Sequence, residues 1–199
     1  MGNMTARSLS PSTPRGEATR QRVLEAAETV FGEKGYYNAS VTEITRAAGV
    51  AQGTFYLYFK GKKEIFLDLV DDLGRRLRAA TLEASASAGT YAEAERLGFK
   101  AFFDLARSHR HIYSIVQECD RVDPTTYRRF YADLADTYKR ANAAAAERGE
   151  IANSDPEVLA YCMLGVGHFV AMRYLLWDDG LRDEAEEAAI AFVQRGLRT

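Results

Sequence analysis

Apolar residues recur every three or four positions along most of the chain, which is the period of an α-helix that buries one face. The first such stripe predicts a helix from about residue 17 to residue 34, and its apolar members are Val23, Leu24, Ala27, Val30 and Phe31. Gly35 follows the stripe, at a position where a left-handed helix cap is expected. Strict alternation of apolar and polar residues extends over no more than a few positions, so the pattern predicts an all-α protein.

Two short helices separated by a glycine turn are predicted next. Ser40 stands three residues before Glu43, which is the sequence of a capping box, so a helix is expected to begin at Val41. Gly49 ends this helix, and a further short helix follows at once from Gln52. A helix, a tight turn and a second helix form the helix-turn-helix arrangement.

Longer helices are predicted for the rest of the chain and bring the total to about nine. One begins at Lys62, and the pattern breaks after it over Ser85–Gly89. Asp123 and Asp155 each precede a proline, which is a frequent helix start because the carboxylate caps the helix and proline fits its first position. The later helices are expected at residues 91–108, 111–120, 124–148, 156–177 and 181–197.

The sequence divides into an arm, a small basic group and a larger acidic bundle. Residues 1–16 are rich in Ser, Thr, Pro and Gly, which predicts a disordered arm. Through Lys62 there are eight Lys and Arg residues against five Asp and Glu, whereas the remaining chain has 18 against 23. A positive head suits contact with a polyanion. We therefore expect one domain at residues 17–63 and a second at residues 64–199.

Composition and cysteine usage indicate a soluble cytoplasmic protein. Of 199 residues, 47% are apolar and 27% are charged, which is ordinary for a globular chain. No apolar run approaches the roughly 18 residues that a membrane-spanning helix needs, and the N-terminus lacks the apolar segment of a secretory signal. Cys119 and Cys162 lie far apart and form no CxxC pair, as suits a reducing compartment.

The stretch from Thr19 to Phe66 resembles the DNA-binding domain of the tetracycline-repressor (TetR) family of bacterial transcription regulators. The resemblance is carried by RVLEAAETVFGEKGYYNASVTEITRAAGVAQGTFYLYFKGKKEIF, in which AAGVAQGTFYLYFKGKKE matches the family's turn and recognition helix nearly position by position. It implies a helix-turn-helix domain followed by a helical ligand-binding and dimerisation bundle. The implied function is that of a DNA-binding transcriptional regulator, most often a repressor released from a palindromic operator by a small ligand. Ala51 stands where many members have a serine, so one helix cap is lost.

Residue chemistry at the start of the recognition helix is suited to reading bases. A helix in the major groove needs small residues at its closest approach and hydrogen-bonding side chains beside them. Gln52 can pair with an adenine edge, Gly53 lets the backbone approach, and Thr54 offers a hydroxyl and a methyl group for thymine. The spacing of Phe55 and Phe59 places both on the inner side, where we expect core packing.

Several neighbouring side chains are suited to phosphate oxygens, which fix the register of the protein on DNA. Tyr56 and Tyr58 carry phenol groups past the tip of the helix, and Lys62 carries an ammonium group. Ser40 and Thr42 lie at a helix start, where free N–H groups also attract anions. A capping role alone is an equal alternative for Ser40.

The helix expected near 124–148 carries a continuous stripe with several phenols, whose members are Tyr127, Tyr131, Leu134, Tyr138, Ala141 and Ala145. A buried phenol needs a hydrogen-bond partner, so a row of them favours a cavity, although core packing is the alternative for each one alone. In the resembled family this bundle is a ligand chamber. The ligand candidates, for a hydrophobic or amphipathic small molecule, are Phe103, Tyr113, Gln117, Tyr131, Tyr138 and His168.

The helix expected at 156–177 is apolar nearly all round, so each of its faces must be covered. Gly165 and Gly167 would permit close approach of another helix, and the helix at 181–197 has a narrow stripe of small residues. This pair of helices resembles the family's dimerisation surface, and we expect a homodimer.

An enzyme and a helical module that binds only protein or metal are the alternatives to a DNA-binding regulator. The sequence has no GxSxG, P-loop, HExxH or dinucleotide-binding motif. His109 and His111, taken with the two cysteines, leave a metal site open. We expect no cofactor, no metal and no membrane partner.

Overall fold

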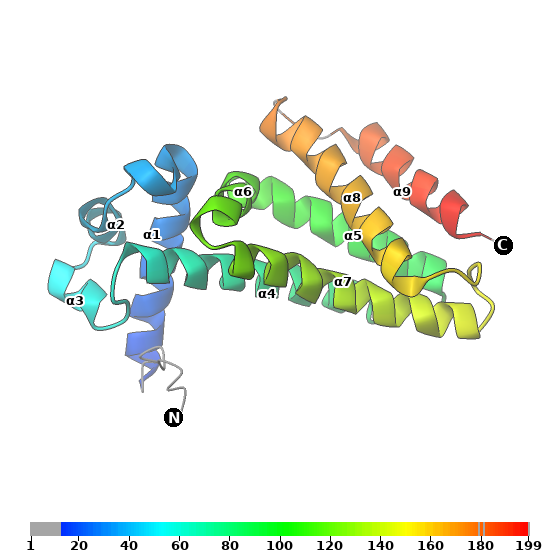
Figure 1. Ribbon diagram of the computed structural model, residues 1–199, viewed down its shortest axis with the longest axis horizontal. Coiled ribbons are helices and arrows are strands. Elements are labelled where there is room, and N and C mark those ends of the chain that lie inside the picture. The colour runs from blue at the N-terminus through cyan, green and yellow to red at the C-terminus, as the bar shows by residue number, and fades with distance from the viewer. Residues whose placement is uncertain (1–12, 179, 181, 199) are drawn as a thin grey trace. The chain divides into compact units, whose positions relative to one another are not determined.

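The computed structural model describes residues 13–178, 180 and 182–198. Its described residues form nine α-helices and contain no strand, so the prediction of an all-α fold is confirmed (Figure 1). A short π-helical turn, Met172–Leu176, continues the eighth helix. The helices are α1 (Pro14–Asn38), α2 (Val41–Ala48), α3 (Gln52–Tyr56), α4 (Lys62–Ser85), α5 (Tyr91–Ser108), α6 (Ile112–Val122), α7 (Pro124–Glu147), α8 (Pro156–Ala171) and α9 (Asp183–Leu197).

The first helix begins earlier than the sequence analysis expected. Residues 1–12 of the predicted disordered arm lie outside the described residues, but residues 14–16 are helical. The Thr13 side chain accepts a hydrogen bond of 3.2 Å from the Gly16 amide, and Pro14 occupies the first helical position. Pro14 therefore starts α1 in the same way that proline starts other helices, and the predicted boundary at residue 17 was wrong.

Local signals elsewhere set the helix ends as predicted. Ser40 and Glu43 form both halves of the capping box at the start of α2. Gly49 ends α2 with a φ of 63°, in the left-handed region, and Gly35 has a φ of 75° and interrupts the helical geometry of α1. The Asp155 side chain accepts hydrogen bonds from two amides of the first turn of α8.

The chain divides into two compact units. Unit 1 comprises the residues up to Asp72 together with Ser114–Tyr127, and unit 2 comprises Leu73–Tyr113 and the residues from Arg128 onward. Helices α4, α6 and α7 therefore each contribute residues to both units. The core of unit 1 is formed by large buried side chains: Leu24, Phe31, Ile44, Phe55, Phe59, Ile65, Phe66 and Leu69.

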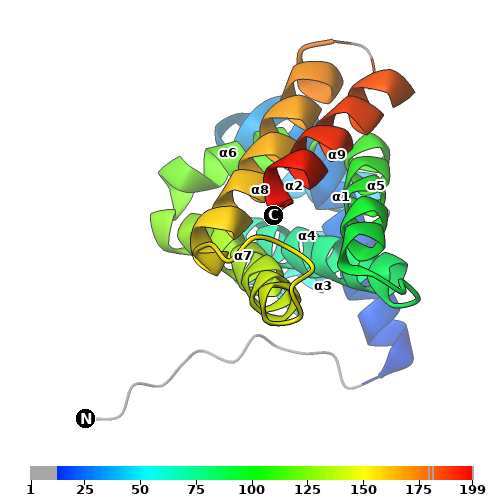
Figure 2. The same ribbon diagram turned by 90° about the vertical axis from the view of Figure 1, so that its right-hand side faces the viewer.

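Within unit 2, α8 and α9 lie side by side, as both views show (Figures 1 and 2). The close approach of α8 to α5 depends on Gly167, because a Cβ atom there would lie 3.3 Å from the ring of Phe102. The segment Pro156–Leu176 is long and apolar enough to cross a membrane by length and composition alone, but a third of its most apolar window is buried inside the protein.

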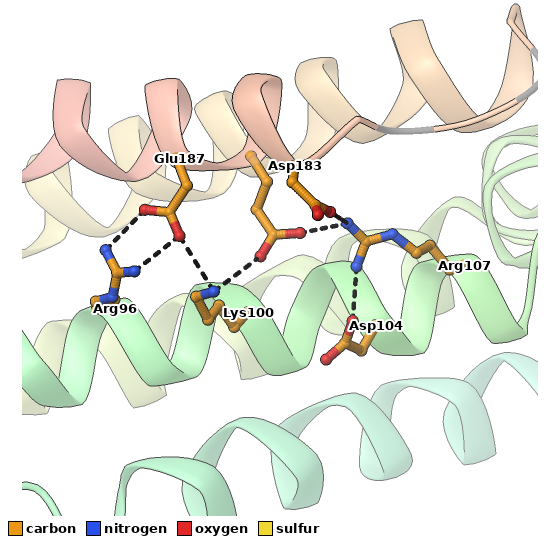
Figure 3. A network of polar contacts seen from close by, with 7 residues as sticks. Arg96, Lys100, Asp104, Arg107, Asp183 and Glu187 are labelled. Atoms are coloured by element: carbon orange, nitrogen blue, oxygen red, sulfur yellow. Dashed lines mark hydrogen bonds and ion pairs between the residues drawn. The ribbon is translucent and has the colours of Figure 1, made fainter.

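A row of ion pairs joins α9 to α5 in unit 2 (Figure 3). The Arg96 guanidinium donates two hydrogen bonds of 2.7 Å to the carboxylate of Glu187, and the Lys100 ammonium lies 3.1 Å from the same carboxylate. Further along, Arg107 pairs with the buried carboxylate of Glu186. Exposed pairs of this kind are individually weak, but in a row they fix the register of one helix against another.

Candidate functional site

The short helix α3 is anchored in the core of unit 1 by one aromatic side chain and leaves its other side exposed. Phe55 is fully buried and its ring centre lies 5.4 Å from that of the buried Phe59, as the sequence predicted for both. Gln52 and Gly53 are exposed at the start of the helix, and Thr54 is half-buried. No atom lies within 4 Å of the position that a Cβ of Gly53 would take. A flat, open helix start of this kind can approach a nucleic-acid groove closely.

The residues predicted to contact DNA from α2 and α3 lie together. The Gln52 side-chain amide donates a hydrogen bond of 3.3 Å to the hydroxyl of Thr42. The Ser40 hydroxyl belongs to the capping box. It donates a hydrogen bond of 2.7 Å to the Glu43 carboxylate and accepts one from the Glu43 backbone amide. Hydrogen bonds from Lys34 and Ser40 lower the pKa of the Glu43 carboxyl to about 2. Glu43 is thus ionised near neutral pH, and Ser40 has a capping role whether or not it meets phosphate.

A shallow groove of about 460 Å³ runs between the first turns of α1 and the start of α3. Two basic side chains, Arg15 and Arg22, line it from α1, and Thr54 and Tyr58 line it from the α3 side. Tyr56 lies on the same short helix and is about half exposed. Sequence reasoning missed Arg22, because only the packing of α1 against the turn brings this arginine beside the recognition helix.

Lys62 has a structural role that the sequence did not show. Its ammonium group donates hydrogen bonds to three backbone carbonyls at the end of α1, those of Tyr36 (2.8 Å), Tyr37 (3.2 Å) and Ala39 (2.9 Å). An ammonium has three donors, so all of them are occupied. The nearby lysine of α4, Lys63, lies 3.2 Å from the carboxylate of Asp123.

Unit 2 holds an aromatic cluster formed by three of the predicted ligand residues. The ring centres of Tyr113 and His168 lie 5.4 Å apart, and the Tyr131 hydroxyl lies 3.4 Å from Nδ1 of His168. The Tyr113 hydroxyl is buried and has no hydrogen-bond partner among the described residues. Burial raises the pKa of Tyr113 and lowers the pKa of His168, so both are neutral near pH 7.

The other predicted ligand residues lie elsewhere. Phe103 is fully buried and packs against Phe99 and Phe102. Gln117 lies on the part of α6 that belongs to unit 1. Tyr138 lines a separate, partly open cavity of about 120 Å³ between α4, α5, α7 and α8.

This cavity has a feature that sequence reasoning missed. Its wall includes Glu95, which is only 5% exposed. The two carboxylate oxygens of Glu95 make no hydrogen bond of regular geometry among the described residues, and the amide of Gln194 is the donor that acts on them. Burial raises the pKa of this carboxyl to about 7. Glu95 follows the first turn of α5 and reads in the sequence as an ordinary surface acid, so only the packing identifies it.

The metal-binding alternative finds no support in the part of the chain that the structure describes, because no three His, Cys, Asp or Glu side chains there are grouped to hold an ion. His109 lies against Arg76, with the closest nitrogens 3.3 Å apart. Cys119 is buried, whereas Cys162 is exposed.

Comparison with known proteins agrees with the geometry of unit 1. Residues 23–69 match the model of the family described as bacterial regulatory proteins, tetR family. An uncharacterized HTH-type transcriptional regulator of Bacillus subtilis, YdgC, is 29% identical over 180 residues, which are 88% of this chain and 89% of that protein. The fatty acid metabolism regulator protein of B. subtilis is 46% identical over 48 residues, about a quarter of each chain.

Solved structures show the same fold over nearly the whole chain. The fatty acid degradation regulator FadR from Bacillus halodurans superposes with a TM-score of 0.79 at 20% identity and covers 94% of this chain and 95% of its own. A TetR-family regulator from Syntrophomonas wolfei gives a TM-score of 0.78 at 21% identity, over 89% of this chain and 94% of that one. The family match and these relatives agree with the exposed helix-turn-helix. The chain belongs to the tetR family of bacterial regulatory proteins and is a DNA-binding transcriptional regulator rather than an enzyme.

Proposed function

We propose that the protein is a homodimeric repressor that binds a palindromic operator and releases it when a small hydrophobic or amphipathic molecule binds in unit 2. DNA binding is supported by the exposed start of α3, where Gln52 and Gly53 lie beside the groove lined by Arg15 and Arg22. Two such helices related by a two-fold axis require half-sites one helical turn apart, about 34–36 Å, or a multiple of it.

Contacts to bases and contacts to phosphates are assigned to different residues in this proposal. Gln52 and Thr54 read base edges, because they stand at the open tip of α3. Tyr56 and Tyr58 contact phosphate together with Thr42 and the start of α2, which Ser40 caps. Arg15 and Arg22 add two positive charges on the groove wall. Lys62 holds the end of α1 against α4. Its positive charge also adds to the positive electrostatic potential of the DNA-binding domain.

The dimer contact is assigned to α8 and α9. Large apolar side chains on the outer side of this pair are exposed: Val158 (59%), Tyr161 (47%), Phe169 (64%) and Phe192 (62%). The three on α8 recur at the helical period, whereas Phe192 lies on α9. Gly165, which lies between Tyr161 and Phe169, has open space where a Cβ would be. A contiguous apolar surface of this kind marks a contact with another protein, and a two-fold axis lets one copy cover it with the same surface of the next.

The effector site is assigned to the aromatic cluster of Tyr113, Tyr131 and His168, with Phe103 and Tyr138 in the same unit. Neutral ring nitrogens and phenols offer hydrogen bonds without charge, which suits a largely apolar ligand. The relatives named for fatty acid metabolism do not identify this ligand. One of them matches over only 48 residues, and the other shares the fold at 20% identity.

An operator titration tests the proposal. Fluorescence anisotropy is measured on duplexes tiled across the region upstream of the protein's own gene, with wild type and Gln52→Ala, and then repeated with small molecules suggested by neighbouring genes. The proposal expects one duplex to bind far more tightly than the rest, and a ligand to weaken this binding about 5–150-fold. Uniform binding to all duplexes would contradict it.

A further inference from the structure

Glu95 is a buried acid with no visible structural reason to be there. Buried carboxyls are normally hydrogen-bonded or paired, since an unsatisfied buried acceptor destabilises the folded protein. Gln194, through a hydrogen bond, and Arg96, through its charge, both lower the pKa of Glu95 against the effect of burial, but both side chains also have other partners. Gln194 donates its amide to the Ala92 carbonyl at 2.9 Å, and Arg96 is engaged with both oxygens of Glu187.

Hydroxyl groups around the same cavity are also directed to other acceptors. The Ser85 hydroxyl donates to the carbonyls of Thr81 (2.8 Å) and Ala94 (2.9 Å). The Tyr91 hydroxyl donates to the side chain of the buried Asn142. Neither hydroxyl therefore donates to the carboxylate of Glu95. Among the described residues, the donor that acts on it is the amide of Gln194, which leaves the two oxygens short of donors.

The rest of the cavity wall is mainly apolar. It is formed by the aliphatic or aromatic parts of side chains from four helices: Leu82, Ala94, Tyr91, Tyr138, Ala141 and Met163. Its volume of about 120 Å³ is close to that of an apolar cavity that accepts benzene. Burial raises the pKa of Tyr138 to about 12, and the nearby charge of Glu95 adds to this effect.

We propose that this cavity binds a small apolar molecule that carries a protonated amine, with Glu95 as the counter-ion and the rings of Tyr91 and Tyr138 as the apolar walls. An ammonium group supplies the donors that the carboxylate lacks, and aromatic rings attract cations. An organic acid of the same size would add a second negative charge, and a neutral molecule would leave the carboxylate unsatisfied. This cavity is separate from the aromatic cluster assigned above to an apolar effector. Only the consequence that the amine also weakens operator binding rests on the proposed function.

Binding is tested in the absence of DNA with three probes of similar shape. Isothermal titration calorimetry at pH 8 measures benzylamine, benzyl alcohol and benzoate against the full-length wild type, Glu95→Gln and Glu93→Gln. Glu93 is an exposed acid on the same helix and serves as the matched control. We expect wild type and Glu93→Gln to prefer benzylamine over the other two probes by at least about tenfold, because a hydrogen bond to a charged group is worth that much.

The outcome in Glu95→Gln decides the inference. The preference for benzylamine should disappear there, with thermal unfolding showing that the variant is folded. Equal binding of benzylamine and benzyl alcohol to wild type, or an unchanged preference in Glu95→Gln, would overturn the proposal. If water alone satisfies the carboxylate, none of the probes binds, which overturns it as well.

Operator anisotropy with and without benzylamine then separates this inference from the proposed function. Release of the operator by benzylamine in wild type but not in Glu95→Gln supports the amine as effector. Selective benzylamine binding with unchanged operator affinity supports the cavity assignment and overturns the effector role. Failure of wild type to bind any upstream duplex contradicts the proposed function, but it leaves the calorimetric result standing.

Discussion

Lys62 donates a hydrogen bond of 2.8 Å to the carbonyl oxygen of Tyr36, and its ammonium lies 4.7 Å from the centre of the Tyr36 ring. The first residue of α4 is in this way tied to the end of α1, where Gly35 interrupts the helix and leaves carbonyls without helical partners. The lysine therefore stabilises the corner between two helices that form the core of the DNA-binding head.

Replacing Lys62 by methionine should lower the free energy of unfolding by about 1–3 kcal/mol, because three carbonyls lose a charged donor. Urea unfolding followed by circular dichroism measures the change. Lys60→Met removes an exposed lysine two residues away and should have little effect. If Lys62→Met instead unfolded like wild type and bound DNA with a weaker salt dependence, the lysine would be a phosphate contact.

Helix ends in this chain are predictable because their signals are local. The capping box of Ser40 and Glu43, the left-handed Gly49 and the cap of Asp155 each involve residues within three positions of one another. Thr13 and Pro14 carry the same kind of signal as Asp155 and Pro156. The start of α1 was missed because the Ser- and Pro-rich composition around it was given more weight than the cap.

The candidate sites depend on residues that only packing brings together. Nothing local distinguishes Arg22 from other arginines of α1, and its place beside Thr54 follows from how α1 crosses the turn. The sequence likewise gives no sign that Glu95 is buried, because the residues that surround it come from α4, α7 and α8. The phenol stripe of α7 was recognised, but its members separate into an aromatic cluster at Tyr131 and a cavity at Tyr138.

Arg22 and Gln52 should affect DNA binding in different ways. Arg22→Gln removes one positive charge from the groove, so it should weaken all sequences alike and lower the slope of log K against log salt by about one. Gln52→Ala should leave that slope unchanged and relax the preference at one base position in each half-site. Anisotropy at several salt concentrations, on the operator and on single-base variants of it, measures both effects.

A matched charge change tells whether the Arg22 effect is local. Arg140→Gln removes an exposed arginine from α7 in unit 2 and should bind DNA like wild type. The same loss of slope in Arg22→Gln and Arg140→Gln would show that net charge, not the groove, determines affinity. A change of base preference in Arg22→Gln would assign that arginine to base reading.

The outer surface of α8 and α9 should hold the dimer together. Phe169→Glu and Phe192→Glu each place a charge on a side chain that is more than 60% exposed, so the fold of one subunit should be preserved while the contact is lost. Analytical ultracentrifugation at micromolar concentration should show dimers for wild type and monomers for both variants. Leu57→Glu, a change at an equally exposed leucine of unit 1, should remain dimeric.

Glu95 should make the protein less stable as the pH rises from about 4.5 to about 7. In this range the carboxyl is ionised in the unfolded chain, but burial keeps it protonated in the folded protein, since its pKa rises from 4.5 to about 7. The folded state then binds more protons than the unfolded state, so stability falls with rising pH and the loss is complete above pH 7. The total is about 3 kcal/mol.

The groups that face Glu95 keep their charge throughout this range. Tyr91 and Tyr138 stay neutral because burial raises their pKa values. Arg96 on α5 acts on Glu95 by lowering its pKa. Gln194 on α9 does not titrate. His168, whose pKa burial lowers, contributes in the opposite direction, but it does so equally in wild type and in a Glu95 variant. A difference between the two proteins therefore isolates the carboxyl.

Urea unfolding of wild type, Glu95→Gln and Glu93→Gln at pH 5 and pH 8 measures this difference. From pH 5 to pH 8 the free energy of unfolding of wild type should fall by about 2.5 kcal/mol relative to that of Glu95→Gln, because glutamine does not titrate. This difference does not depend on the absolute stability of the variant. Glu93→Gln should follow wild type. Parallel pH dependence in wild type and Glu95→Gln would mean that the carboxyl is ionised in the folded protein at pH 5, and hence that a donor already satisfies it. The cavity would then have no unmet charge to offer an amine.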